Sequence, residues 1–128
     1  MITIQLRHPF KGSTGSLQVE PLGGTLHRVA EIPSALFGDP FECGDVIDVV
    51  TAADGVCELR EVRERGNWRR FDFLVTRAHA ESPELARVLD RVVGAGGQWV
   101  RDAGGVLSIV LPPDSTWDPN DDVHGCAP

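Results

Sequence analysis

The chain has 128 residues, of which 41% are hydrophobic and 24% charged, and its formal net charge is −7 at pH 7. This balance is typical of an ordinary soluble globular protein, and the length suffices to bury a core without metals or disulfides. The excess of acidic residues argues against generic binding to nucleic acid or to an anionic membrane, and it suits a basic protein partner.

The first part of the chain is predicted to be rich in β-strands. Apolar and polar residues alternate from Ile2 to Arg7, which is the pattern of a half-buried strand. Gly44 and Asp45 form a turn signal directly before an apolar β-branched run, because glycine tolerates a positive φ and aspartate bonds to nearby backbone. We expect strands over residues 2–7, 17–19, 25–30 and 46–50, and an irregular connection over residues 34–41 that carries Phe37 and Phe41.

A hairpin signal at Asp54-Gly55 leads into what the pattern predicts to be a long two-stranded ribbon. Its strands are expected over Cys57–Arg65 and Trp68–Thr76, with the turn at Gly66-Asn67. The apolar positions of the first strand change phase along its length, which predicts a β-bulge near Arg60-Glu61.

One amphipathic helix is predicted over Pro83–Val93. Ser82 suits the N-cap, the following proline suits the first helical position, and apolar residues recur along one face with helical spacing. A final hairpin is expected over residues 98–101 and 106–111, with Trp99 packed in the core.

These elements predict an α+β protein, in which a β-rich, partly barrel-like N-terminal part runs into a β-α-β-β sheet covered by one main helix. We expect a single compact domain over residues 1–116, β-rich over 1–54 and formed by the ribbon and the β-α-β-β sheet over 55–116. Residues 117–128 contain aspartate and proline but no lysine or arginine, which predicts a loosely held acidic tail.

An ordered set of short sequence patterns resembles a known bacterial family. The patterns are His27–Pro33, Phe37-Gly38, Cys43–Ile47, Val62–Gly66 and Pro112-Pro113. Together they resemble the family catalogued as domain of unknown function 4265, over roughly residues 25–116. That family usually has phenylalanine after Ile-Pro, where this chain has Ser34. The resemblance implies a small uncharacterised cytosolic protein and assigns no catalytic residue.

Arginine is concentrated along the predicted ribbon. Its side chains suit phosphate or carboxylate, and Trp68 can stack on a base, so nucleic-acid or nucleotide binding through this Arg-rich hairpin is one hypothesis. In the alternative, which the alternation of Glu and Arg favours, Glu58, Glu61, Glu64 and Asp72 neutralise the arginines through cross-strand ion pairs. The arginines concerned are Arg60, Arg63, Arg65, Arg69, Arg70 and Arg77. Arg69 and Arg70 are the least balanced, and with Trp68 they are the candidate binding residues.

No motif identifies a catalytic site, and we expect neither a metal nor a cofactor. His27 would form an acid–base pair with Asp45 or Asp48 if their strands adjoin, although a structural histidine is the commoner role. The three cysteines lack the paired spacing of a zinc site. Cys43 is expected to be a small buried residue, because the acidic neighbours Glu42 and Asp45 raise a thiol pKa.

The leading functional hypothesis is a non-catalytic protein–protein interaction module of a bacterial cytoplasm, with an immunity-like or antitoxin-like role as a narrower version. No apolar run reaches the ~20 residues that span a bilayer, and Met1–Ile4 lacks the basic region of a leader, so we expect a cytoplasmic location and no membrane contact. Phe37 and Phe41 of the irregular connection are the further candidate contacts. The sequence leaves the partner and the oligomeric state open.

Overall fold

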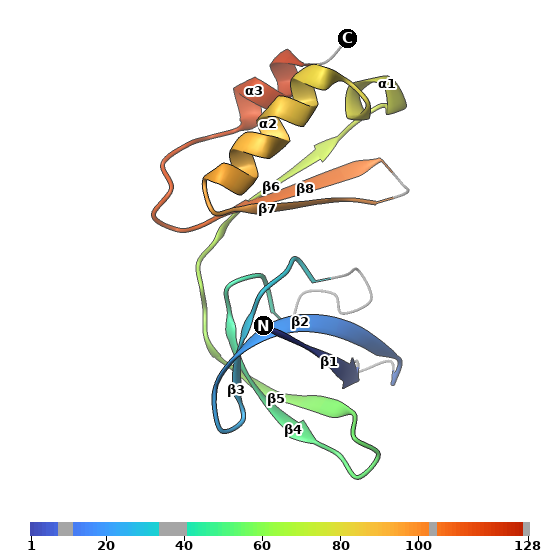
Figure 1. Cartoon of the computed structure of the whole chain (residues 1–128), viewed down its shortest axis with the longest axis vertical. Helices are drawn as coiled ribbons and strands as arrows, with labels where there is room; N and C mark the ends of the chain where they lie inside the picture. The colour runs from blue at the N-terminus through green and yellow to red at the C-terminus, as the bar shows by residue number, and fades with distance from the viewer. Residues whose placement is uncertain (8–11, 34–40, 103–104, 127–128) are drawn as a thin grey trace. The chain divides into compact units, whose positions relative to one another are not determined.

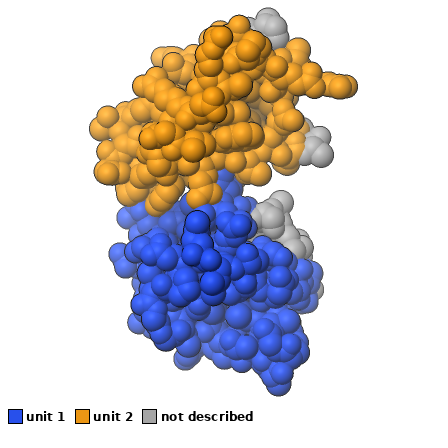
Figure 2. Space-filling model, in the orientation of Figure 1, with its two compact units in different colours: residues 1–67 blue, residues 68–128 orange. Residues whose placement is uncertain are grey.

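The computed structural model describes residues 1–7, 12–33, 41–102 and 105–126. The chain divides into two compact units, Met1–Asn67 and Trp68–Pro128 (Figure 2). This differs from the single domain expected over residues 1–116, and the boundary falls where a hairpin turn was predicted. Asn67, at the boundary, has a φ of 56°. The α+β class and the β-rich, barrel-like first part are confirmed.

Unit 1 is a closed barrel of five strands (Figure 1). The strands are β1 (Ile2–Arg7), β2 (Thr14–Gly23), β3 (Leu26–Val29), β4 (Val46–Thr51) and β5 (Cys57–Glu64). Consecutive strands are antiparallel, and β1 closes the barrel by pairing in parallel with β5. Period-two alternation turns one side of each strand inward, and the buried core is Leu6, Leu17, Val19, Val29, Phe41, Ile47 and Val49.

A β-bulge in β5 confirms the predicted change of phase. Ile47 of β4 lies opposite Val62, whereas Val49 lies opposite Leu59, so β5 contains one more residue than β4 over this stretch. The extra residue, Arg60, allows both Leu59 and Val62 to pack against the barrel core.

Unit 2 is a three-stranded sheet covered on one face by helices (Figure 1). The strands β6 (Arg69–Leu74), β7 (Gln98–Arg101) and β8 (Val106–Leu111) are arranged in the order β6-β8-β7, with β8 antiparallel to both neighbours. Between β6 and β7 the chain forms the short helix α1 (Arg77–Ala80) and the main helix α2 (Pro83–Gly94). The predicted cap is present, because Ser82 Oγ accepts a hydrogen bond from Leu85 N at 3.2 Å.

The predicted ribbon of Cys57–Arg65 and Trp68–Thr76 is wrong. β5 pairs with β4 and β1 in unit 1, whereas β6 pairs with β8 in unit 2. The intervening backbone crosses the Gly44 turn so closely that a Cβ on Gly66 would lie 2.4 Å from the Gly44 carbonyl carbon. The glycine at position 66 therefore serves this crossing and not a hairpin.

The acidic C-terminal segment is ordered as far as residue 126, in contrast to the loose tail expected over residues 117–128. Its described part ends in a third helix, α3 (Asn120–Gly125), whose Val123 is fully buried in the core of unit 2. Trp117 Nε1 donates to Asp122 Oδ2 at 2.9 Å, and the Arg91 guanidinium stacks 4.1 Å above the Trp117 ring. No helix within the described residues is long and apolar enough to cross a membrane.

Candidate functional site

The arginines at the end of β5 are paired with carboxylates of the barrel. Arg63 Nε donates to Glu61 Oε1 at 2.8 Å, and its Nη2 lies 3.5 Å from Asp48 Oδ2. Arg65 Nη1 donates to Asp45 Oδ2 at 3.0 Å. These contacts agree with the hypothesis that nearby carboxylates neutralise the arginines. The partners, however, belong to the barrel and not to the second strand of a ribbon.

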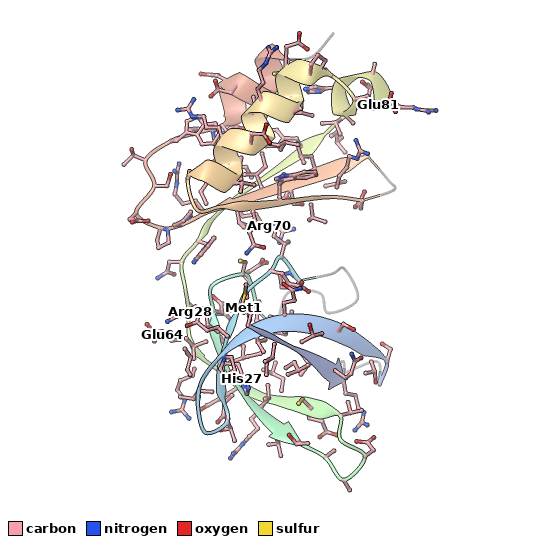
Figure 3. All side chains as sticks on the ribbon, viewed as in Figure 1. Met1, His27, Arg28, Glu64, Arg70 and Glu81 are labelled. Atoms are coloured by element: carbon pink, nitrogen blue, oxygen red, sulfur yellow. The ribbon has the colours of Figure 1, made fainter. Side chains whose placement is uncertain are left out.

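Charges of both signs also alternate across the outer face of the barrel. Arg28 lies opposite Val46, and Val46 lies opposite Glu64, so the three residues form one row over β3, β4 and β5. Arg28 and Glu64, the two charged ends of this row, are labelled in Figure 3. Arg28 approaches Glu20 at 3.8 Å on its other side. A mixed row of this kind is typical of a solvated surface and gives no concentrated positive potential for phosphate.

Arg70 belongs to a polar cluster on the face of the unit 2 sheet that points away from α2 (Figure 3). Its Nε lies 3.2 Å and 3.3 Å from the two carboxylate oxygens of Asp72. Ser108 Oγ donates to Asp72 Oδ1 at 2.6 Å, and Arg70 Nη2 lies 3.5 Å from the same hydroxyl. The guanidinium is thus held by groups of β6 and β8.

Arg69 holds the C-terminal segment on unit 2. Its Nη1 donates to the carbonyl oxygens of Ser115 at 2.8 Å and Trp117 at 2.6 Å, and its guanidinium lies 5.1 Å from the centre of the Phe71 ring. The neighbouring Trp68 is half-buried. The role of Arg69 is therefore structural, and sequence reasoning had no means of finding carbonyl partners 46 and 48 residues away.

An Arg69→Ala substitution is expected to release the C-terminal segment. Two hydrogen bonds from a charged donor are lost, and each is worth about 1.5–3 kcal/mol. Limited proteolysis should then cleave between Pro112 and Gly125 at lower protease concentration, and urea unfolding of unit 2 should shift to lower urea. Arg87→Ala is the matched control, because Arg87 is exposed and makes no ion pair within the described residues. Unchanged cleavage in Arg69→Ala would contradict this role.

Of the two phenylalanines predicted as contacts, Phe41 lies in the barrel core. Its side chain is 1% exposed and packs with the other residues of the unit 1 cluster. It is therefore not available at the surface. Phe37 lies outside the described residues.

Asp45 joins two segments of unit 1, its own turn and the stretch that follows β5. Its Oδ2 accepts from Glu42 N at 2.9 Å and from Arg65 Nη1 at 3.0 Å, and its Oδ1 accepts from Gly66 N at 2.8 Å. The residue is only 2% exposed, so a carboxylate in this place depends on these donors. The turn expected at Gly44-Asp45 is present, and its side chain also fixes backbone that lies 21 residues further along the chain.

His27 does not form an acid–base pair with either aspartate. His27 lies opposite Ile47, whereas Leu26 lies opposite Asp48, so the His27 and Asp48 side chains point to opposite faces of the barrel wall. The His27 ring bonds instead to its neighbour, with Nδ1 3.1 Å from the Thr25 carbonyl oxygen. Among the described residues, Asp48 Oδ1 has no hydrogen-bond partner.

Cys43 is chemically protected. Burial raises the pKa of its thiol to about 12, and the charges of Glu42 and Asp45 add to this effect. The sequence predicts the direction from the acidic neighbours, but burial is the larger cause. A thiol with this pKa is almost entirely protonated at neutral pH and is a poor nucleophile. Within the described residues no three His, Cys, Asp or Glu side chains are placed to hold a metal ion.

The free edge of β7 is the surface feature that the sequence prediction missed. In the part of the chain that the structure describes, β7 pairs with β8 and with no other strand. Trp99 and Val100 are 43% and 45% exposed on this edge. The expectation that Trp99 packs in the core is therefore wrong. Trp99 lies opposite Ile109 on the helix side of the sheet, but the sheet ends at β7 and leaves the indole partly uncovered.

Comparisons with known proteins support the fold alone. No protein-family model matches the chain, and no curated protein matches its sequence. The chain is similar to a solved structure described as a hypothetical protein from Neisseria gonorrhoeae, with a TM-score of 0.55 and 15% sequence identity. That similarity covers 96% of this chain and 81% of the other. The resemblance to domain of unknown function 4265 stays a prediction.

Proposed function

We propose that this chain is a non-catalytic protein–protein interaction module of a bacterial cytoplasm, and that the free edge of β7 is its contact. The exposed Trp99 and Val100 on this edge are the observation that carries the proposal. An edge strand offers unpaired backbone N–H and C=O groups, which give affinity to an added strand, while its side chains give specificity.

The placement of the charged residues supports binding over catalysis. The arginines and aspartates that the sequence offers as candidate site residues stabilise the fold. Arg69 donates to backbone carbonyl oxygens, Arg70 pairs with Asp72, and Asp45 accepts from backbone N–H groups. Because Arg69 and Arg70 bind groups of their own unit in this way, nucleic-acid binding through them is disfavoured. A net charge of −7 favours a basic partner, as an immunity-like or antitoxin-like role would require.

The test is capture of partners by the tagged full chain from a lysate of its native host. Val100→Lys places a charge on the β7 edge, which is a common means of blocking strand addition. The matched control is Val93→Lys, because Val93 is an exposed apolar residue of α2. We expect a stoichiometric partner that the wild type and Val93→Lys retain and Val100→Lys loses. Equal capture by all three proteins would exclude β7 as the contact.

A further inference from the structure

The side chains of β7 are arranged in a way that suits pairing with an identical strand. Trp99 and Arg101 lie opposite the core residues Ile109 and Leu107, so both belong to the helix side of the sheet. Val100 lies opposite Ser108 on the other side. Within the described residues Arg101 is exposed and takes part in no ion pair or ring contact, so its guanidinium is available to a partner.

Symmetry limits how two copies of β7 can meet. Joining two sheets edge to edge in antiparallel fashion, about a two-fold axis perpendicular to the sheet, keeps the helix side of both copies on the same face. Residues directly opposite each other then have side chains on one face. The two-fold axis must therefore pass between the two copies of one residue of β7, and that residue lies opposite itself.

The charge of Arg101 decides which residue of β7 can lie on the two-fold axis. An axis through Arg101 places two guanidinium groups opposite each other, which is destabilising. An axis through Gln98 or Trp99 places Arg101 opposite Ala95 or Gly97, neither of which offers an aromatic ring or a carboxylate. An axis through Val100 places Arg101 of each copy opposite Trp99 of the other. Opposite side chains in a sheet lie about 4.5–5.5 Å apart at Cβ, so the long Arg101 side chain can bring its guanidinium within ~6 Å of the centre of the Trp99 ring, as a cation–π contact requires.

We infer that two copies of this chain associate through antiparallel pairing of β7 with β7, centred on Val100, with two reciprocal Arg101–Trp99 contacts. This inference rests on the proposed function because it concerns the same edge, which a second copy occupies when no basic partner is bound. A charged residue on an edge strand ordinarily prevents pairing. In the register centred on Val100, Arg101 meets the aromatic face of Trp99. In the register centred on Arg101 it meets a second arginine. Arg101 therefore selects the first register and does not prevent pairing.

The dimer is expected to be weak. Each copy contributes one four-residue strand, and an interface of that size lies below the ~1,200 Å² of a stable complex. We expect a dissociation constant on the order of 0.1 mM, in the range of weak complexes. The full chain should therefore be monomeric at low micromolar concentration and dimeric near 1 mM.

Sedimentation velocity of the full chain over about 10 µM to 1 mM tests the inference. Trp99→Glu places a carboxylate opposite Arg101 of the other copy and should keep the dimer. Trp99→Arg places like charges opposite each other in two places. Its dissociation constant should be at least about 10-fold higher than that of Trp99→Glu. Adding Arg101→Glu to Trp99→Arg restores opposite charges and should restore the dimer.

Two outcomes would overturn the inference, and circular dichroism melts verify that each variant is folded. Equal dissociation constants for Trp99→Glu and Trp99→Arg would exclude the register centred on Val100, because an axis through Trp99 makes both substitutions repulsive. A wild-type chain that stays monomeric at 1 mM would exclude a second copy as the occupant. The proposed function would survive that result if a different protein is still captured through β7.

Discussion

A Gly66→Ala substitution is expected to destabilise unit 1 by about 3 kcal/mol, the upper part of the range for overpacking. The added Cβ would lie 2.4 Å from both the carbonyl carbon and the oxygen of Gly44 and 2.9 Å from its Cα. All three are backbone atoms, so no flexible side chain can move to relieve the clash. Hydrogen exchange at the amides of β4 and β5 should accelerate by about 100-fold, as a free-energy loss of this size implies.

Gly94→Ala is the matched control for this prediction. A Cβ at Gly94 would meet no atom within 4 Å, and the residue ends α2 without a left-handed φ. Alanine there should be neutral or stabilise by up to about 1 kcal/mol. If Gly66→Ala exchanges as slowly as the wild type, the backbone crossing between Gly44 and Gly66 is looser than described.

An Asp45→Ala substitution is expected to cost about 3–5 kcal/mol of unfolding free energy, the range of the most damaging single substitutions. Removal of the carboxylate leaves the partly buried N–H groups of Glu42 and Gly66 without the acceptor that Asp45 gives them, and each such loss costs about 1–3 kcal/mol. Equilibrium urea unfolding followed by far-ultraviolet circular dichroism gives the difference.

Arg65→Ala separates the contribution of the Arg65–Asp45 ion pair from that of the backbone N–H groups that donate to Asp45. The Arg65 side chain is 58% exposed, so water replaces much of what it gives Asp45, and we expect a loss of about 1 kcal/mol or less. A loss in Arg65→Ala as large as that in Asp45→Ala would mean that the ion pair, and not the backbone N–H groups, holds the junction.

The elements that the sequence predicts well are those specified by neighbouring residues. Helix α2 begins at the expected proline because the N-cap serine and the helical spacing of Leu85 and Leu89 act within a few residues. The hairpin of β7 and β8 and the bulge at Arg60 follow from the same kind of local pattern.

Strand partners and burial depend on residues far away in the chain, and there the sequence prediction fails. Alternation in β5 and β6 identifies both as strands but does not specify that they pair in separate sheets. The C-terminal segment has a composition typical of disorder, yet Val123 finds a place in the core and Arg69 binds the carbonyls before it. The exposure of Trp99 likewise follows from the edge position of β7, which no local pattern marks.

The boundary at Asn67 has a consequence for optical measurements. The chain has three tryptophans, Trp68, Trp99 and Trp117, and no tyrosine, and all three tryptophans belong to unit 2. Intrinsic fluorescence and absorbance at 280 nm therefore report on residues 68–128 alone, because the barrel contains no tryptophan or tyrosine. An unfolding curve recorded through tryptophan emission follows one half of the molecule, and a tryptophan placed in the barrel would be needed to follow the other.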